Sequence, residues 1–329
     1  AFAMCYRETV CGYEITGRKS ADRRNSNRNR KAYYHMNVEI TEFEKSYSFE
    51  LEPITQLCGQ NVRKKNYILE SLRRYFGTYK YTETKNKWRD NVLIDHECVG
   101  RKYFSIISIR EIADMIQLIK WSKQSLMMEY VKNIMQKFDW QLHLRTITEE
   151  VEEMFQIINK DISRLGDIEL TYSMSEVWDM IQKSDVSGTD DTDLLDKSNY
   201  ELIIVLLNLI DEVLGYAPKK TMVIFENVDH LIDPEEYIDI VNRAERIARK
   251  YDVYFVFSTS LEGYVCCSTE LCSGISVFGD ADFQLTEFGN MCGFIRDNYP
   301  YAKDISEEQV QRILARIIQK IGQKGYLYS

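Results

Sequence analysis

Residues 59–66 read Gly-Gln-Asn-Val-Arg-Lys-Lys-Asn and place a glycine and a lysine at the spacing of a phosphate-binding loop. A working loop reads G-x-x-x-x-G-K-[ST]: backbone N–H groups surround the phosphates, the lysine reaches them, and the hydroxyl binds Mg²⁺. Gly59 and Lys65 keep two of these positions, but Lys64 replaces the second glycine and Asn66 replaces the hydroxyl residue. Lys64 carries a Cβ where φ freedom is usually needed, and an amide is a poorer ligand for a hard cation. The spacing predicts a degenerate phosphate loop formed by Gly59, Lys65 and Asn66.

An acidic motif follows the apolar run Thr221–Phe225. Residues 222–233 align with the segment of ABC-type ATPases in which four apolar residues precede a metal-holding Asp and a general-base Glu. Glu226 stands at the metal position and Asn227 at the position of the base, and an amide takes no proton from water at neutral pH. Residues 258–260, Ser-Thr-Ser, stand where those enzymes carry a histidine, and no LSGGQ-like signature precedes Glu226. These departures predict a binding protein rather than an enzyme.

Two other interpretations of these motifs stay open. Gly59 and Glu226 can simply mark a tight turn and the end of a strand, or the chain can be an active P-loop ATPase acting in DNA repair or maintenance. Glu226 and Asp229 are the acidic pair closest to the expected metal position.

The eight cysteines contain no pair of C-x-x-C units, which argues against a zinc site. Free thiols favour a protein of the reducing cytoplasm.

A basic segment follows the glycine, although the whole chain carries a net charge of −9. Residues 60–90 hold nine basic and three acidic side chains, which is a local excess of six positive charges. A basic patch on an acidic protein suggests phosphate contacts, so we predict DNA binding here. The predicted DNA-binding residues are Arg63, Lys64, Lys65, Arg73, Arg74, Lys80, Lys85, Lys87 and Arg89. Alternatively, these side chains solvate one helix face or meet the acidic residues 185–196 of a neighbouring subunit.

The elements that must position these residues follow from hydrophobic periodicity. Short strands are predicted over residues 37–40 and 48–51, and a buried strand over Ile54–Cys58 ends at Gly59. An amphipathic helix over residues 64–76 comes next, and strands are predicted over residues 92–94 and 103–109. Buried strands at residues 221–225 and 253–257 alternate with helices at residues 200–214 and 235–250. Buried strands alternating with helices predict an α/β fold with a mainly parallel sheet.

The domain organisation is read from the same pattern. Residues 1–35 are rich in Arg and Asn and lack apolar periodicity, so we expect a leader outside the fold. Residues 36–109 and 199–329 are predicted to form the α/β head, and residues 110–184 a helical lobe with two long helices. The Asp-rich residues 185–198 read as an acidic linker, because their spacing misses that of a calcium-binding loop. No apolar run reaches the roughly 20 residues of a membrane-spanning helix.

Three segments together resemble a known family. They are residues 49–59 with the basic helix that follows, residues 223–233 with Asn-Val-Asp-His at 227–230, and residues 254–260. These segments resemble the CRISPR-associated spacer-acquisition proteins of type II-A loci, the Csn2 family, and in particular its longer-chain subgroup. They lie within residues 36–288, and the helical lobe is inserted between the first and the second.

The resemblance implies a P-loop NTPase-like, ABC-ATPase-like head with defunct nucleotide motifs and an inserted α-helical lobe. It implies a ring-shaped homotetramer that encircles double-stranded DNA, prefers DNA ends and supports spacer acquisition in antiviral defence without enzymatic activity. It also implies calcium ions that stabilise the assembly, and partnership with the integrase complex and the RNA-guided nuclease of the same locus. Calcium ligands cannot be matched residue by residue, and Glu226 and Asp229 are the metal candidates.

Overall fold

A computed structural model describes residues 35–77, 90–171, 181, 183–189, 192–298 and 306–322. The chain divides into two compact units, one formed by Ala1–Arg110 with Lys219–Ser329 and the other by Glu111–Pro218. The predicted leader, residues 1–35, lies outside the described residues except for His35. Among the described helices, none has both the length and the apolar character that crossing a membrane requires.

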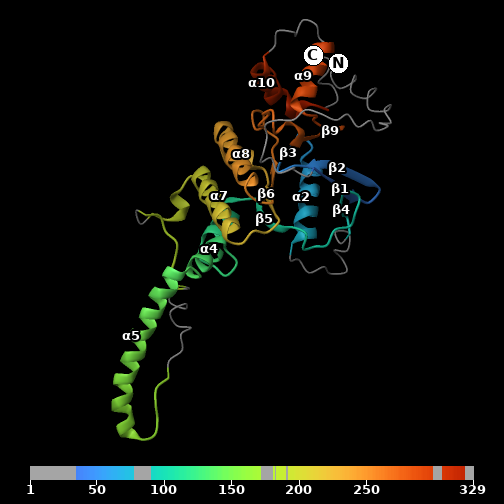
Figure 1. Cartoon of the computed structure of the whole chain (residues 1–329). Helices are drawn as coiled ribbons and strands as arrows, with labels where there is room; N and C mark the ends of the chain where they lie inside the picture. The colour runs from blue at the N-terminus through green and yellow to red at the C-terminus, as the bar shows by residue number, and fades with distance from the viewer. Residues whose placement is uncertain are drawn as a thin grey trace, which may run out of the picture. The chain divides into compact units, whose positions relative to one another are not determined.

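The first unit is built on a six-stranded sheet in the order β5-β6-β7-β3-β8-β9 (Figure 1). Its strands are β5 (Ser105–Ile109), β6 (Thr221–Phe225), β7 (Val253–Ser258), β3 (Ile54–Cys58), β8 (Ile275–Phe278) and β9 (Asp282–Gln284). All neighbours pair in parallel except β8 and β9, which are antiparallel. Strands β3, β6 and β7 are buried along their whole length, as continuous apolar runs in a covered parallel sheet require. The predicted parallel sheet is confirmed.

The sheet is covered on both faces (Figure 1). On one face, helix α2 (Val62–Phe76) packs between the large sheet and a small antiparallel sheet of β2 (Lys45–Leu51), β1 (Met36–Glu42) and β4 (Val92–Ile94). Tyr254 and Val256 of β7 join this core, whereas helix α8 (Pro234–Ala248) lies against the opposite face of β3 and β7, with the ring of Tyr237 5.8 Å from that of Phe257 of β7. Alternate side chains of one strand therefore serve two separate cores.

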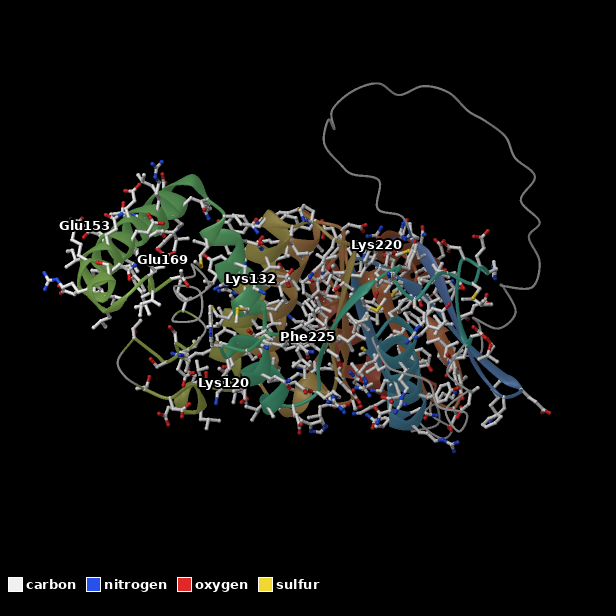
Figure 2. All side chains as sticks on the ribbon, turned by 90° about the horizontal axis from the view of Figure 1, so that it is seen from below. Lys120, Lys132, Glu153, Glu169, Lys220 and Phe225 are labelled. Atoms are coloured by element: carbon white, nitrogen blue, oxygen red, sulfur yellow. The ribbon has the colours of Figure 1, made fainter. Side chains whose placement is uncertain are left out.

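The two ends of β6 fix the direction of the sheet (Figure 2). Lys220 precedes the strand, and its Nζ lies 4.0 Å from the ring centroid of Tyr103. Phe225 ends the strand and stacks on Phe257 of β7, with ring centroids 5.1 Å apart. The carboxyl ends of the parallel strands, and the loops that follow them, therefore lie at the edge where Phe225 stands.

Helices α9 (Phe288–Asn298) and α10 (Glu307–Ile317) with the short helix η7 (Ile318–Lys320) complete the first unit. Their apolar side chains, including Phe288, Leu314 and Ile318, form a core with Val277 of β8 and with Cys58. The sequence patterns predicted none of these C-terminal helices. The described cysteines are free thiols, most of them buried.

The second unit contains α3 (Ile112–Ile119), α4 (Leu126–Met135), α5 (Phe138–Ile162) and α7 (Asn199–Tyr216), with short helices η2 (Ser163–Leu165) and η3 (Leu194–Asp196). The prediction of two long helices is wrong for this region, because Ser125 caps a separate α4 by accepting a hydrogen bond from the Met128 N–H. The predicted start of the second head segment at residue 199 is also wrong. Helix α7 packs against α3 and α4, and the boundary falls at Lys219.

Candidate functional site

The predicted phosphate loop lies between the carboxyl end of β3 and helix α2. Gly59 has φ +97°, a conformation that L side chains rarely adopt. A Cβ at this position would stand 2.3 Å from the carbonyl oxygen of Phe278 on β8. Glycine is therefore required here both by the backbone conformation and by the close approach of a neighbouring strand.

Several backbone N–H groups of this loop donate to acceptors within the protein. The Gly59 N–H donates to Oε1 of Gln319 at 2.6 Å, and the Asn61 N–H donates to the Phe278 carbonyl at 3.0 Å. Asn61 caps α2, since its Oδ1 accepts the Lys64 N–H at 3.1 Å and its carbonyl accepts the Lys65 N–H at 3.2 Å. These N–H groups are the ones that would surround a phosphate in a working loop.

Lys65 points inward from α2 and is fully buried. Its Nζ donates to the carbonyl oxygen of Thr259 and, at 2.7 Å, to Oγ of Ser260, both in the loop after β7. Burial lowers the pKa of Lys65 to about 8, although the charges of Cys58 and Asp229 favour its protonated form. The ammonium is enclosed, so the prediction that Lys65 contacts DNA is corrected.

Asp229 belongs to the same buried network. It lies in the short helix η4 (Val228–His230), where Asn227 adopts a left-handed conformation with φ +53°. One carboxylate oxygen, Oδ2, accepts the N–H groups of Ser260 at 2.5 Å and Leu261 at 2.8 Å. The other oxygen, Oδ1, is buried and has no hydrogen-bond partner among the described residues. Asp229 thus holds the loop that encloses the Lys65 ammonium.

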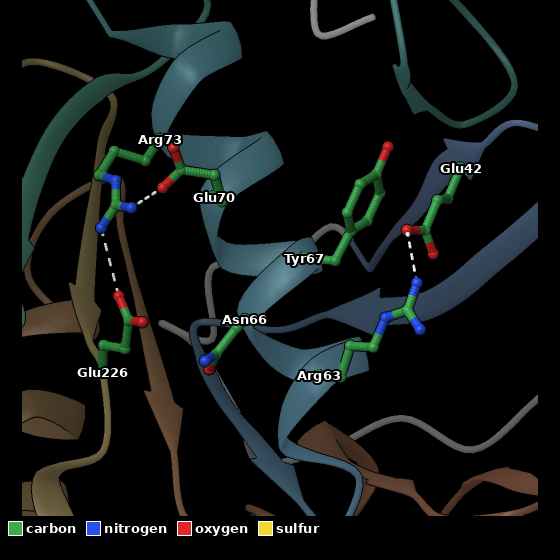
Figure 3. Close-up of a pocket in the computed structure, with 7 residues that line it drawn as sticks. All are labelled: Glu42, Arg63, Asn66, Tyr67, Glu70, Arg73 and Glu226. Carbon is green, nitrogen blue, oxygen red and sulfur yellow. Dashed lines mark hydrogen bonds and ion pairs between the residues drawn. The ribbon is translucent and has the colours of Figure 1, made fainter.

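Glu226 faces a different place, an open pocket of about 380 Å³ beside α2 (Figure 3). Its Oε2 lies 3.2 Å from the guanidinium of Arg73, which also pairs with Glu70. At the other side of the pocket Arg63 lies 3.8 Å from Glu42. The pocket is lined by Glu42, Arg63, Asn66, Tyr67, Glu70, Arg73 and Glu226. Asn66 and Glu226, two positions of the predicted nucleotide motifs, therefore do share one pocket.

The surroundings of Glu226 and Asp229 do not fit a calcium site. Calcium takes six to eight oxygen ligands, whereas a guanidinium occupies Glu226 and backbone N–H groups occupy Asp229. No group of three or more acidic, His or Cys side chains able to hold a metal is present among the described residues. We do not assign calcium to this pair, and the calcium expected from the family resemblance stays a prediction.

The predicted basic cluster is only partly displayed at the surface. Arg63 has 89% of its side chain exposed, whereas Lys64 pairs with Asp282 at 2.7 Å. Arg73 and Arg74 both pair with Glu70 on their own helix. Lys80, Lys85, Lys87 and Arg89 lie outside the described residues. Within the described part of the segment, Arg63 is therefore the cation most accessible to a phosphate.

The sequence analysis did not identify Gln319 and Phe278, which accept hydrogen bonds from the Gly59 and Asn61 N–H groups. They lie 260 and 217 positions further along the chain than Gly59 and Asn61. Gln319 is buried next to Ile318 in the C-terminal apolar core, and a glutamine in an apolar stripe is a weak signal on its own.

Comparisons with known proteins identify the family of this chain and a solved structure with a similar fold. A family model described as CRISPR-associated protein Csn2 subfamily St matches residues 41–318. The crystal structure of Stu0660 of Streptococcus thermophilus superposes with a TM-score of 0.75 at 21% identity, covering 88% of this chain and 87% of that chain. The SmcHead bound to the C-winged helix domain of ScpA gives a TM-score of 0.42 at 11% identity, covering 78% of this chain and 95% of that one. A TM-score this low supports no conclusion about a shared fold. No curated protein sequence matches the chain.

Proposed function

We propose, from the premise that this chain belongs to the CRISPR-associated protein Csn2 family, subfamily St, that it is a non-enzymatic binder of double-stranded DNA. Membership of this family implies a role in CRISPR adaptation. In the proposal the chain assembles into a ring-shaped homotetramer that threads onto DNA ends, and it serves the integrase complex and RNA-guided nuclease of its locus. Its head is a P-loop-like fold whose nucleotide motifs are defunct.

The proposal that the protein is not an enzyme is supported by the predicted phosphate loop, whose N–H groups and lysine are already hydrogen-bonded within the protein. A nucleotide needs free backbone N–H groups and an accessible lysine at this loop. Here the Gly59 N–H is bonded to Gln319, the Asn61 N–H to Phe278, and Lys65 to the loop after β7. Each of these groups must first lose a protein partner, which makes nucleotide binding unfavourable.

The residues around Glu226 do not support the alternative that the chain is an active P-loop ATPase. Asn227 stands where a general base is needed, and Arg73 occupies the carboxylate of Glu226 that would hold Mg²⁺. We expect no stoichiometric ATP binding by calorimetry and no phosphate release above background. Phosphate release that Lys65→Met abolishes would contradict this part of the proposal.

The DNA-binding part is supported by the local charge and by the family. Arg63 is exposed at the start of α2, and the undescribed Lys80, Lys85, Lys87 and Arg89 remain predicted contacts. A protein that binds phosphates without reading bases loses affinity steeply as salt rises. Lys65 is withdrawn from this set because it is buried, and Arg73 and Arg74 are engaged by Glu70.

The decisive experiment compares linear and circular duplex DNA of equal length and sequence. A closed ring needs an end to thread, so we expect retention of the linear duplex and little retention of the covalently closed circle in a mobility-shift assay. Light scattering on the same sample should give four times the mass of one chain. Equal binding of both DNA forms would overturn the ring, and binding of neither would overturn the DNA-binding function.

A further inference from the structure

The turn between β1 and β2 carries a phenylalanine in a backbone conformation that favours glycine. Glu42 pairs with Lys45 across the hairpin, so Phe43 and Glu44 form a two-residue loop. Phe43 has φ +54°, in the left-handed region. Two-residue hairpin loops need a positive φ at the first loop position, where Gly, Asn or Asp is usual because a bulky side chain is strained. The residue type at position 43 therefore opposes the turn that it forms.

Burial does not compensate for this strain. Phe43 is 84% exposed, the largest exposed fraction among the large apolar residues of the described chain. The apolar core beneath the hairpin includes Ile40, Tyr47 and Phe49, and Phe43 is not among its described members. Strained residues persist where the surrounding structure holds them, and they are frequent at sites of function. A contact outside the chain is therefore the physical reason that remains for a phenylalanine here.

The hairpin holds Phe43 in a fixed position. Glu42 accepts a hydrogen bond from the Tyr47 hydroxyl at 2.7 Å, and the Thr41 carbonyl accepts one from the Tyr67 hydroxyl at 3.0 Å. Both acceptors lie at the end of β1, directly before the turn. A rigid loop loses little conformational entropy when it binds, and exposed aromatic side chains held in this way are typical anchors of protein interfaces.

The charges around Phe43 balance one another. Glu44 and Lys45, both exposed, follow it along the chain, and Arg63 lies 3.8 Å from Glu42 (Figure 3). The tip therefore has no net charge, whereas the whole chain carries −9. A DNA backbone attracts surfaces with an excess of positive charge, and two copies of an acidic chain repel each other least where their surfaces are neutral. The charge balance favours a second copy of this chain over DNA as the partner.

We propose that Phe43 anchors a contact between two copies of this chain, related by a two-fold axis at the turn between β1 and β2. In such a contact each surface meets itself, so the two phenylalanine rings pack together and Glu44 faces the partner subunit's Lys45. A hairpin tip covers less than the roughly 800 Å² that each partner buries in a standard interface, so Phe43 anchors a larger interface. The inference rests on the proposed function in that the contact belongs to the assembly proposed there, and it does not require DNA binding.

The test removes the ring with and without relief of the backbone. Phe43→Ala and Phe43→Gly both lose the ring, and both should raise the dissociation constant of the assembly at least about tenfold. Sedimentation equilibrium over a range of protein concentrations measures this constant. Phe43→Tyr keeps the ring and should assemble as the wild type does. Ile238→Ala is the matched control, because Ile238 is an exposed apolar residue of α8 in the same unit.

The two ring-deleted variants also test the strain. Both lack the contact, but only glycine adopts the positive φ freely. Phe43→Gly should therefore unfold at a temperature roughly 2 °C or more above that of Phe43→Ala. Equal unfolding temperatures would show that the turn is not strained, and would remove the argument that Phe43 is kept for a contact.

A charge exchange tests the two-fold arrangement. Glu44→Lys and Lys45→Glu each place like charges across the axis and should weaken the assembly, whereas the combined variant restores opposite charges and should assemble nearly as the wild type does. A tip that met DNA would instead bind linear duplex more tightly in Glu44→Lys and more weakly in Lys45→Glu. Failure of the combined variant to recover assembly would overturn the two-fold contact.

The outcomes separate the inference from the proposed function. Unchanged assembly of Phe43→Ala and Phe43→Gly would overturn the inference and leave the tetramer intact. Weaker DNA binding by these variants with unchanged assembly would assign the tip to DNA and overturn the inference too, as would a failure of both variants to fold. A wild-type dimer that Phe43→Ala converts to monomers would support the inference and contradict the tetramer. A monomeric wild type would overturn both.

Discussion

Lys65 keeps the sequence position of a phosphate-binding lysine while its ammonium is bonded to Thr259 and Ser260. A buried ammonium is unfavourable unless its three donors find acceptors, and the loop after β7 supplies two of them. Asp229 fixes that loop through the N–H groups of Ser260 and Leu261. The same residue type at the same position thus serves the interior of the protein rather than a ligand.

Lys65→Met tests the cost of this buried charge. The folded-state pKa of about 8 lies below the ordinary lysine pKa of 10.5, so the unfolded chain binds more protons between these two pH values. The free energy of unfolding of the wild type should therefore rise from pH 8 to pH 10.5 relative to Lys65→Met. The relative gain should reach about 3 kcal/mol. Urea unfolding of both proteins across this pH range measures it.

The comparison with the variant controls for other groups that titrate in the same range. Burial raises the pKa of the Cys58 thiol to about 11, which makes stability fall as pH rises. Because the Lys65 charge acts on this thiol, the wild type and Lys65→Met are both compared in a Cys58→Ala background. Parallel stability curves for the wild type and Lys65→Met would show that the ammonium is not held at a lowered pKa.

Helix α2 is the element that gathers the candidate site. Its N-terminus is fixed by Asn61, whose Oδ1 accepts the Lys64 N–H and whose Nδ2 donates to the Gly279 carbonyl at 3.2 Å. Lys64 donates to the same carbonyl at 3.1 Å and pairs with Asp282. The helix is thereby joined to the turn between β8 and β9, and the Gly322 carbonyl accepts the N–H groups of that turn. The helix, the turn and the segment 318–322 form one continuous set of contacts.

Asn61→Ala should destabilise the protein by about 1–2 kcal/mol, because it removes both the helix cap and the contact with Gly279. Asn61→Asp keeps the capping oxygen and adds a favourable charge at the helix N-terminus, so its loss should be smaller. Chemical denaturation of the two variants beside the wild type gives the difference. Equal losses for Ala and Asp would mean that the cap contributes nothing measurable.

At the scale of the whole molecule, exposure and ion pairing distinguish the basic residues that are available to bind DNA from those that stabilise the fold. Arg63 is exposed, and its ion pair with Glu42 is long, at 3.8 Å. Arg73 and Arg74 pair with Glu70, so reversing the charge of either would place two like charges next to each other on α2. Arg63 is therefore the better position at which to test the predicted DNA surface.

Arg63→Glu should weaken binding to linear duplex DNA and lower the slope of log affinity against log salt by roughly 0.9, the value for one phosphate contact. Arg312→Glu on α10 is the control, since Arg312 is similarly exposed and pairs loosely with Glu308. Fluorescence anisotropy over a range of salt concentrations gives the slopes. An unchanged slope would remove Arg63 from the DNA surface, whereas a smaller assembly with unchanged DNA binding would make it an assembly residue.

The sequence by itself determined the elements that are local in the chain. The continuous apolar runs of β3, β6 and β7 predict a parallel sheet covered on both faces, and the apolar stripe of α2 predicts the helix that follows β3. The replacements Lys64, Asn66 and Asn227 predict degenerate nucleotide motifs, and three short segments resemble the family. Each of these conclusions depends on neighbouring residues, so a single sequence is enough to reach it.

Only the tertiary structure decided what the loop contacts. Gly59 meets Gln319, Asn61 meets Phe278 and Lys65 meets Thr259, in each case across about 200 residues or more. The structure also assigned α7 to the second unit, because an amphipathic helix does not specify which apolar surface it covers. Buried polar groups must be satisfied, and the partners that satisfy them are brought close by the packing of distant elements. The sequence predicts a degenerate phosphate loop after β3, and the fold supplies that loop with hydrogen-bond partners from the protein itself.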